Sequence, residues 1–392
     1  MFDIAELARQ SEARRQELIN MRRDFHRHPE LAFKESRTAG IVADKLRQAG
    51  LEVQTGVAET GVVGMLRGAK PGRTVLVRAD IDALPILEQH DSEYVSQNQG
   101  VMHACGHDGH TAIALTVAEL LAGQRGDLAG NVKFVFQPAE EIVSGAKPMI
   151  EQGVMQGVDA AIGLHLGNDQ PVGSVCMKAG PSMANVDNVI LTVRGKGGHG
   201  SQPEKAIDSI MAACQLVTTL QTLVSREISP ADTAVLSFGT INGGFASNII
   251  APEVVLAGTV RSFQPDVRET MLRRIEEIAV TLGKALRCDV KMEVSYSCPA
   301  VVNDAGMAEL VRQSAVAALG GQNVTEMKPI MGSDDMSLFL REVPGCYFVV
   351  GSGHLNGSSF PHHHPGFDIE EESLVVGTRV MTQAVLDFLS RP

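Results

Sequence analysis

The spacing of apolar positions predicts helices in the first part of the chain. Between about residues 4 and 27, apolar side chains recur at helical spacing among charged ones, which predicts one amphipathic helix that ends before Pro29. A second helix is predicted over residues 37–48. His26 and His28 lie at the end of the first helix, where we expect them to interact with the terminal carbonyls rather than with a metal.

Four short apolar runs predict buried strands at residues 74–80, 131–138, 158–164 and 345–351. Apolar strands that alternate with helical segments are typical of a sheet covered by helices on both faces. Such sheets bind ligands beyond the carboxyl ends of their strands. Because carboxylates or imidazoles follow all four runs, we expect the chemistry of the chain to lie at that edge of the sheet.

A different order of elements occupies the middle of the chain. Strands and helices are predicted in the order β-α-β-β-α-β, at residues 189–193, 204–224, 234–241, 254–263, 267–286 and 290–296. This order is that of a ferredoxin-like module. We therefore predict an α/β fold in which a mixed-sheet catalytic domain, residues 1–183 and 298–392, carries an inserted ferredoxin-like α+β domain, residues 184–297.

The stretch from Met102 to His110 concentrates side chains that bind metals. It contains a thiol, three imidazoles and a carboxylate, and an apolar run follows it, which predicts a loop at a helix N-terminus. Cys thiolate and neutral His suit zinc and its neighbours, and Gly106 lets Cys105 and His107 turn toward one point. Cys-x-His is not a strict zinc-finger spacing, so the loop alone also fits a buried Cys beside surface histidines.

Glu140 and Glu141 follow a predicted strand. Neighbouring residues of an extended segment point in opposite directions, so one carboxylate can bind metal while the other transfers a proton. Alone, such a pair is common in solvated loops. Other strand ends and the loop before the helix supply further ligands, at Cys105, His107, His165 and a histidine of the 362–364 cluster. Together these residues indicate a two-metal site, which activates water and polarises a carbonyl.

Composition narrows the partners and the compartment. A chain of 392 residues favours two domains, and a net charge of −12 argues against nucleic acid or an anionic membrane as partner. The six cysteines have no framework spacing, which indicates free thiols and a reducing compartment. The first residues resemble no leader and no apolar run has the length of a membrane span, so we expect a cytoplasmic protein.

Eight motifs carry a resemblance to a known enzyme family. They are DFHRHPEL at 24–31, RADIDALP at 78–85, MHACGHDGH at 102–110, FQPAEE at 136–141, GLH at 163–165, GKGGH at 195–199, GSDD at 332–335 and HHPGF at 363–367. With these motifs the chain resembles, over essentially its whole length, the M20 metallopeptidases. Within them it resembles the amidohydrolase subfamily of aminoacylases, hippurate hydrolases and auxin-conjugate hydrolases.

The resemblance implies two divalent metal ions, zinc or manganese, with cobalt or nickel as alternatives. The implied ligands are Cys105, His107, Glu141, His165 and His363. Glu140 is implied as the general base, and Asp82 as a carboxylate that orients a ligand. The choice of His363 depends on counting back from Pro365 and Phe367, and it leaves His362 and His364 open.

In the inserted domain, the resemblance implies that His199 reaches the active site of a partner subunit and donates a hydrogen bond to the oxyanion. This role requires a homodimer or homotetramer. Asn248 and Arg261 are implied to hold the substrate's α-carboxylate. From the residues alone, His199 also fits an ordinary loop histidine, and Arg261 a charged residue on a strand face. Asp334 stands where the subfamily more often has Glu, which puts its role in doubt.

We therefore expect a metal-dependent hydrolase that cleaves the amide bond of N-acyl-amino acids or short peptides, with the inserted domain closing over the substrate. The alternative within the enzyme class is a carboxypeptidase or dipeptidase that uses the same site. A metal-binding module without activity and a zinc-stabilised structural protein are further alternatives. The pair Glu140-Glu141 speaks against a pure binding protein, which has no use for a free carboxylate.

Overall fold

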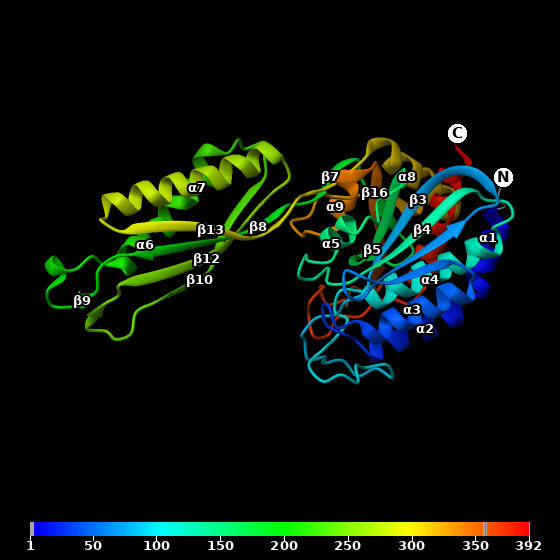
Figure 1. Cartoon of the computed structure of the whole chain (residues 1–392), viewed down its shortest axis with the longest axis horizontal. Coiled ribbons are helices and arrows are strands. Elements are labelled where there is room, and N and C mark those ends of the chain that lie inside the picture. The colour runs from blue at the N-terminus through cyan, green and yellow to red at the C-terminus, as the bar shows by residue number, and fades with distance from the viewer. Residues whose placement is uncertain (1–3, 356, 358, 392) are drawn as a thin grey trace. The chain divides into compact units, whose positions relative to one another are not determined.

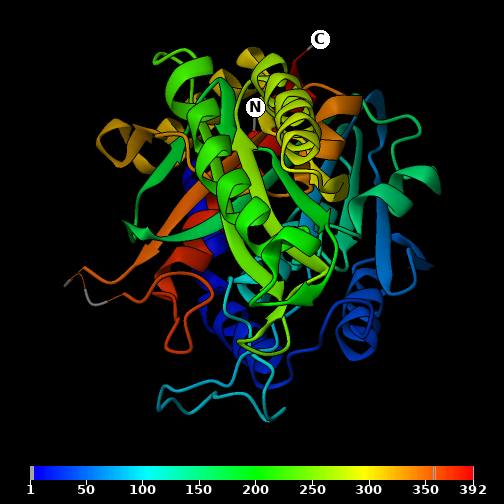
Figure 2. The same ribbon diagram turned by 90° about the vertical axis from the view of Figure 1, so that its left-hand side faces the viewer.

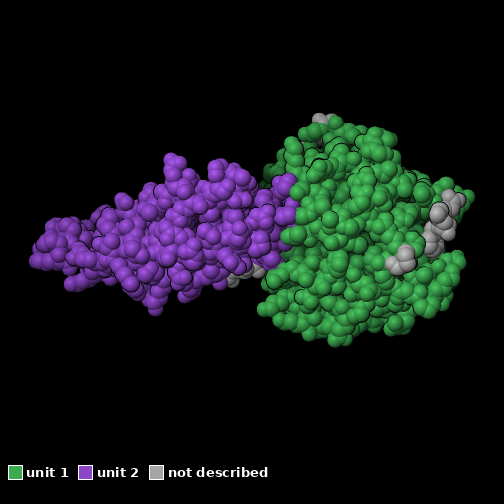
Figure 3. Space-filling view, turned by 90° about the horizontal axis from the view of Figure 1, so that it is seen from above, with its two compact units in different colours: residues 1–180, 302–328, 334–392 green, residues 181–301, 329–333 purple. Residues whose placement is uncertain are grey.

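The computed structural model describes residues 4–355, 357 and 359–391, and the chain divides into two compact units (Figures 1 and 3). Unit 1 comprises residues 1–180, 302–328 and 334–392, and unit 2 comprises residues 181–301 and 329–333. The predicted insert thus lies within unit 2. Residues 329–333, predicted for the catalytic part, group with unit 2 as well. That the two parts are a catalytic domain and an inserted domain remains a prediction.

Unit 1 is built around an eight-stranded mixed sheet of order β1-β2-β4-β3-β5-β16-β6-β15. The strands are β1 (Glu52–Val57), β2 (Gly61–Arg67), β3 (Lys70–Asp80), β4 (Ala129–Gln137), β5 (Ala160–Pro171), β6 (Val175–Met177), β15 (Val324–Glu326) and β16 (Gly345–Gly353). Strands β4, β3, β5 and β16 run parallel at its centre, whereas β1 and β2 add to it antiparallel. The four apolar runs of the sequence form this centre, which confirms the predicted sheet.

Helices cover both faces of this sheet (Figure 1). They are α1 (Ile4–Ala13), α2 (Arg15–Arg27), α3 (Ser36–Gln48), α4 (His107–Gly123), α5 (Ala146–Glu151), α8 (Ala305–Leu319), α9 (Met336–Glu342) and α10 (Glu372–Ser390), with a 3-10 turn at Gly321–Asn323. Neighbouring residues of β5 show the two faces, since Gly163 lies against Met336 of α9 and Leu164 lies near Gly377 of α10. The buried strands therefore have no face in water, which explains why their sequences are apolar without alternation.

The single helix predicted for residues 4–27 is wrong, because two helices occupy this segment. The chain tightens at Arg14, whose N–H donates to the carbonyl of Ser11, and α2 begins at the next residue. The Arg14 guanidinium lies 2.8 Å from a carboxylate oxygen of Glu119 on α4. The break therefore coincides with a contact to a neighbouring helix, which the spacing of apolar residues does not reveal.

Unit 2 has the predicted ferredoxin-like arrangement, with antiparallel strands in the order β10-β12-β8-β13. Its main elements are β8 (Val186–Arg194), α6 (Ser209–Thr222), β10 (Ala234–Gly243), β12 (Glu253–Ser262), α7 (Pro265–Ala285) and β13 (Asp289–Cys298). Its shorter elements are β9 (Gly198–His199), β11 (Ile249–Ile250), a 3-10 turn at Pro203–Lys205 and a π-helical turn at Leu223–Glu227. Strands β7 (Gly180–Met183) and β14 (Val301–Asn303) pair with each other.

Both helices of unit 2 lie side by side on one face of its sheet (Figure 2). Helix α6 begins later than predicted, because Asp208 accepts hydrogen bonds from the backbone N–H groups of Ile210 and Met211 and caps the helix there. Within the described residues of both units, every helix is too short or too polar to span a membrane.

Candidate metal centre

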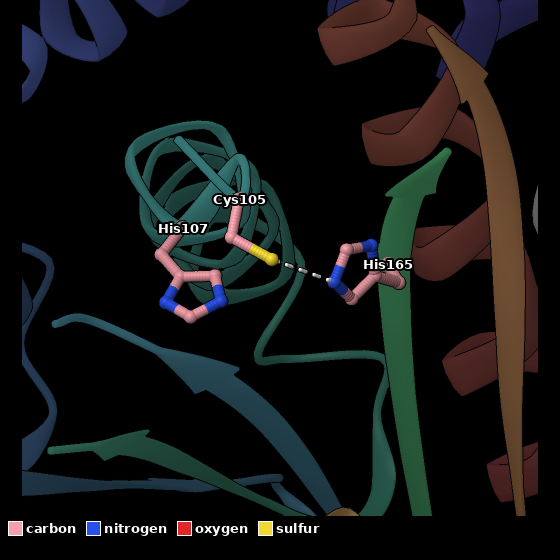
Figure 4. A group of neighbouring side chains, drawn as sticks. All are labelled: Cys105, His107 and His165. Carbon is pink, nitrogen blue, oxygen red and sulfur yellow. Dashed lines mark hydrogen bonds between the residues drawn. The ribbon is translucent and has the colours of Figure 1, made fainter. Parts of the chain in front are cut away.

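The loop before α4 directs the Cys105 thiol toward His165 of β5, and the ring of His107, the first residue of α4, lies beside that thiol (Figure 4). Gly106 has a φ of 89°, a left-handed conformation that suits glycine, and the chain turns there between Cys105 and His107. The Cys105 Sγ atom lies 3.6 Å from Nε2 of His165. One donor atom from each of Cys105, His107 and His165 lies within 4.8 Å of the others, so the three side chains can share one ion.

A second group joins the same thiol to the C-terminal part of unit 1. Donor atoms of Cys105, Glu141 and His363 also lie within 4.8 Å of one another. Among the three consecutive histidines, His363 is the one that lies against Glu141, with 3.2 Å between Nε2 and Oε2. His362 directs Nε2 to a backbone carbonyl at 2.8 Å, and the ring of His364 is stacked on a phenylalanine ring. The geometry therefore favours His363 as the ligand.

Glu140 and Glu141 do not lie in an extended segment, and the prediction that they point in opposite directions was wrong. Ala139 has a φ of 53° and ends the strand conformation, and the Val143 N–H donates to the Glu140 carbonyl at 2.7 Å. In the resulting turn, both carboxylates lie 3.9 Å from Nε2 of His107. Both acids are thus within reach of the same site.

Two buried atoms of this cluster fit a metal ion. Among the described residues, Nε2 of His107 and Oε1 of Glu141 have no hydrogen-bond partner. A buried polar atom without a partner costs roughly 1–3 kcal/mol, so a cation bound by both atoms would remove this cost. The donor set of thiolate, imidazole and carboxylate suits divalent ions of the first transition row. The residues therefore fit the metal that the resemblance implies.

The pKa values of the buried groups also indicate a site that suits a cation. Burial lowers the pKa of His107, but the carboxylates of Asp80 and Glu141 outweigh it and raise that pKa to about 10. Burial, reinforced by the charges of Asp334 and Glu141, raises the pKa of Glu140 well above its usual range. Neighbouring carboxylates contribute to both shifts, since negative charge raises the pKa of an imidazole and of a carboxyl group alike. Divalent ions would compensate this charge.

Asp82 lies between two of the expected ligands. The Nδ1 atom of His107 lies 2.9 Å from the Asp82 carbonyl oxygen and 3.4 Å from its Oδ1. With the proton on Nδ1 donated to these oxygens, Nε2 keeps its lone pair for a metal. The other carboxylate oxygen of Asp82 accepts a hydrogen bond from the Glu141 N–H at 3.0 Å. The position of Asp82 is that of a residue that orients ligands.

The sequence alone did not identify a further group of buried residues that contact the candidate ligands or their neighbours. The Nδ1 atom of His110 lies 2.6 Å from Oδ1 of Asp80, and its Nε2 accepts a hydrogen bond from the N–H of Leu166, the neighbour of His165. Arg78 donates to the other oxygen of Asp80 at 2.6 Å. Asp80 and His110 both stand in the motifs quoted above, but a motif does not show which of its residues bind metal and which hold the ligands in place.

Asp334 and Asp335 complete this buried network. Asp334 accepts a hydrogen bond from the Tyr347 hydroxyl at 2.6 Å. Asp335 accepts hydrogen bonds from Arg78 at 3.0 Å and from Gln137 at 2.7 Å. Burial raises the pKa of Asp335 to about 7, although Arg78 opposes the shift. Oδ1 of Asp334 also lies 3.2 Å from the Arg78 guanidinium, so both aspartates contact the arginine that donates to Asp80.

The remaining predicted site residues lie in unit 2. His199 on β9 is exposed, and its Nδ1 accepts a hydrogen bond from the Ser201 N–H at 3.1 Å, which leaves the proton on Nε2. Asn248 lies beside it, since the Gly200 N–H donates to the Asn248 carbonyl at 2.8 Å. Arg261 on β12 donates one guanidinium N–H to the carbonyl of Met331 at 2.7 Å. The structure therefore groups His199 with Asn248.

The expectation for the two histidines of α2 holds for one of them. His28 interacts through Nδ1 with the carbonyl of Asp24 at 2.8 Å, as expected at a helix end. For His26 the expectation was wrong. Its ring is fully buried and lies 2.7 Å from Asp108 and 3.0 Å from Glu88. Helix α2 packs on α4, so His26 faces the interior of unit 1 rather than the helix terminus.

Comparison with known proteins places these observations in a family. Residues 76–387 match the model of peptidase family M20/M25/M40. The chain is 40% identical over 369 residues to thermostable carboxypeptidase 1 of Saccharolobus solfataricus, with 92% of each chain covered. It is 39% identical over 368 residues to an N-acetylcysteine deacetylase of Bacillus subtilis, covering 93% of this chain and 95% of that one. The crystal structure of the Bacillus subtilis YXEP protein, a dinuclear metal binding peptidase from the M20 family, superposes with a TM-score of 0.86 at 33% identity and covers 97% of this chain and 99% of that one.

Proposed function

Because the chain belongs to peptidase family M20 and is a hydrolase of that family, we propose that it cleaves the amide bond of N-acyl-amino acids with the help of two divalent metal ions. The observation that carries this proposal is the pair of overlapping ligand groups at the strand ends of unit 1. In the proposal, five residues hold the ions, namely Cys105, His107, Glu141, His165 and His363. Bound there, the ions would lower the pKa of a water molecule and polarise the substrate carbonyl.

Glu140 is the general base of the proposal. Its carboxylate is buried and lies 3.9 Å from Nε2 of His107, so it is next to one of the proposed metal ligands. It takes a proton from water and returns that proton to the nitrogen of the leaving amine. The burial and the neighbouring charges that raise its pKa also suit the second step, in which Glu140 acts as an acid.

Unit 2 supplies the groups that bind the rest of the substrate. His199 carries its exposed proton on Nε2 and can donate it to the carbonyl oxygen as negative charge develops there. Asn248 and Arg261 hold the α-carboxylate, for which the planar guanidinium fork of Arg261 is well suited. Unit 2 acts as a lid, and His199 serves the active site of a partner subunit in a homodimer or homotetramer.

The metal of the proposal is zinc or manganese, with cobalt and nickel as alternatives. The Cys105 thiol and the three imidazoles favour zinc, whereas the Glu141 carboxylate also suits manganese. A metallo-carboxypeptidase or dipeptidase that uses the same ligands is the second candidate. It is supported by the similarity to thermostable carboxypeptidase 1 over 92% of the chain.

The test is release of free amine from N-acetyl- and N-benzoyl-amino acids and, in parallel, from dipeptides and N-blocked dipeptides. The proposal predicts that metal-loaded protein hydrolyses at least one acyl-amino acid with a higher kcat/KM than any of the peptides. Turnover of the peptides alone would overturn this proposal and favour a carboxypeptidase or dipeptidase. No turnover of either class by folded, metal-loaded protein would overturn both.

A further inference from the structure

A second group of ligand-type side chains in unit 1 shares no residue with the centre described above. It consists of His26, at the C-terminal end of α2, and of Glu88 and His90, in the irregular segment 86–101 between β3 and α4. One donor atom from each of the three lies within 4.8 Å of the others. Two imidazoles and a carboxylate are ligands that zinc accepts, and water can complete its four-coordinate shell.

Two imidazole nitrogens lie close to one carboxylate oxygen. His26 Nε2 lies 3.0 Å from Oε1 of Glu88, and His90 Nε2 lies 2.7 Å from the same oxygen. The side chains of His26, Glu88 and His90 are 0%, 3% and 17% exposed. Among the described residues, the buried Nε2 of His90 has this close contact with the Glu88 carboxylate and no other polar partner. Donors of a tetrahedral zinc site lie about 3.3 Å apart, so shifts of a few tenths of an ångström would admit the ion.

The ring of His26 is oriented by a carboxylate on its second nitrogen, as is usual for histidines that bind metals. Its Nδ1 lies 2.7 Å from Oδ2 of Asp108, and the same oxygen accepts a hydrogen bond from Nε of Arg22 at 2.8 Å. A carboxylate on Nδ1 fixes the tautomer and directs the lone pair of Nε2 toward the ion. The competing explanation is a doubly protonated His26 that bridges Asp108 and Glu88 by hydrogen bonds. In that explanation His90 is a further charged partner of Glu88, through the contact of 2.7 Å, and the group holds protons in place of a metal ion.

We propose that His26, Glu88 and His90 bind a divalent cation of the zinc class, separate from the catalytic ions. The site is structural, because Glu88 also accepts a hydrogen bond from the Ser96 N–H at 2.7 Å and so closes segment 86–101 on itself. The ion fastens this segment to the end of α2. Segment 86–101 leads directly into the loop that carries Cys105. By holding this segment in place, the ion also helps to hold that loop in place.

The experiment measures zinc bound per chain after the full-length protein is stripped with a chelator and dialysed against zinc alone. His90→Ala removes the most exposed of the three ligands, and Glu88→Gln keeps the shape of the side chain while weakening it as a ligand. His28→Ala is the matched control, since His28 lies at the same helix end and its ring has polar contacts with the backbone carbonyl and the carboxylate of Asp24. Both site variants should bind one zinc ion fewer than the wild type and His28→Ala.

Cobalt identifies which ion is lost. A Cys105 thiolate bound to cobalt gives a charge-transfer band, and the site of His26, Glu88 and His90 contains no thiolate. The band per chain should therefore be equal in the wild type and His90→Ala while the cobalt content differs by one. Equal metal content in all four proteins would overturn the proposal, and so would a loss of the thiolate band together with the lost ion. The difference of one ion decides the result whatever the substrate of the enzyme.

Discussion

Nε2 of His363 lies 3.2 Å from Oε2 of Glu141, and this contact joins a loop near the C-terminus to the turn that follows β4. This contact distinguishes His363 from His362 and His364, whose rings contact other groups. His362 lies against the carbonyl of Leu166, and the His364 ring is stacked on Phe360 with 4.4 Å between the ring centroids.

This relationship predicts that His363→Ala weakens metal binding and amide cleavage together. Loss of a partner that only orients a ligand costs roughly 10–100-fold in affinity or activity, and loss of the ligand itself should exceed that. His364→Ala, the neighbouring control, should retain both metal content and kcat/KM within about twofold. Titration of stripped protein with zinc gives the affinities. The assignment fails if His364→Ala loses metal and His363→Ala keeps it.

The two adjacent glutamates should separate metal binding from proton transfer. Glu140→Gln removes the base, so kcat should fall by at least about 10²–10⁴-fold while the metal content stays at the wild-type value. Glu141→Gln should instead lower the metal content, because it replaces a ligand. Metal analysis and turnover are measured on the same preparations. Unchanged turnover in Glu140→Gln would remove its assignment as the base.

The sequence indicated that candidate ligands gather at one edge of the sheet, because Glu141, His165 and His363 follow apolar strands, and the structure brings donor atoms of these residues near Cys105. The sequence did not predict in which direction the side chains of the candidate ligands point. The positive φ of Ala139 turns both Glu140 and Glu141 to one side, and alanine gives no warning of such a turn. The choice among three consecutive histidines likewise depends on a tertiary contact with Glu141.

The supporting residues were hidden for a related reason. Asp80, His110 and Arg78 act on the centre only through contacts between β3, α4 and β5, which bring together side chains far apart in the sequence. His26 was assigned to a helix end from local sequence, whereas the packing of α2 on α4 buries it. Local patterns predict elements, but the partners of a buried polar side chain depend on how the elements pack.

Arg261 should matter only for substrates that carry an α-carboxylate. A hydrogen bond between charged groups contributes about 1.5–3 kcal/mol, so Arg261→Ala should lower kcat/KM for an N-acetyl-amino acid by roughly 10–100-fold. The same variant should act on the corresponding N-acetyl-amino acid amide as well as the wild type does. The ratio of the two kcat/KM values is the measurement. An equal loss on both substrates would mean that Arg261 supports the structure of unit 2 instead.

Asp368 should make unit 1 sensitive to acid. It accepts hydrogen bonds from buried Arg22 at 2.9 Å and from the Tyr94 hydroxyl at 2.7 Å. Burial alone raises the pKa of Asp368, but Arg22 and these hydrogen bonds outweigh burial and lower it below the ordinary 3.8. The unfolded chain therefore takes up this proton first as the pH falls. The contribution to stability is present above about pH 4 and is lost as the pH falls toward the lower folded pKa.

Asp368→Asn should accordingly lower the free energy of unfolding at neutral pH by about 1–3 kcal/mol and flatten its decline below about pH 4. Glu309→Gln on the exposed surface of α8 is the control. Its partner Arg312 is half exposed, and such surface pairs contribute about 1 kcal/mol at most. Urea unfolding at about pH 7 and pH 3.5 gives both values. Equal effects of the two substitutions would show that the buried pair has no special role.

The most direct test of the whole account is to restore metal to the stripped protein and follow amide cleavage. Chelator-treated, folded protein is titrated with zinc or manganese while amine release from an N-acetyl-amino acid is measured. The account predicts almost no turnover without metal, and a rise with added metal that levels off once the centre around Cys105 and Glu141 is filled. Full turnover by folded protein that contains no metal would contradict it.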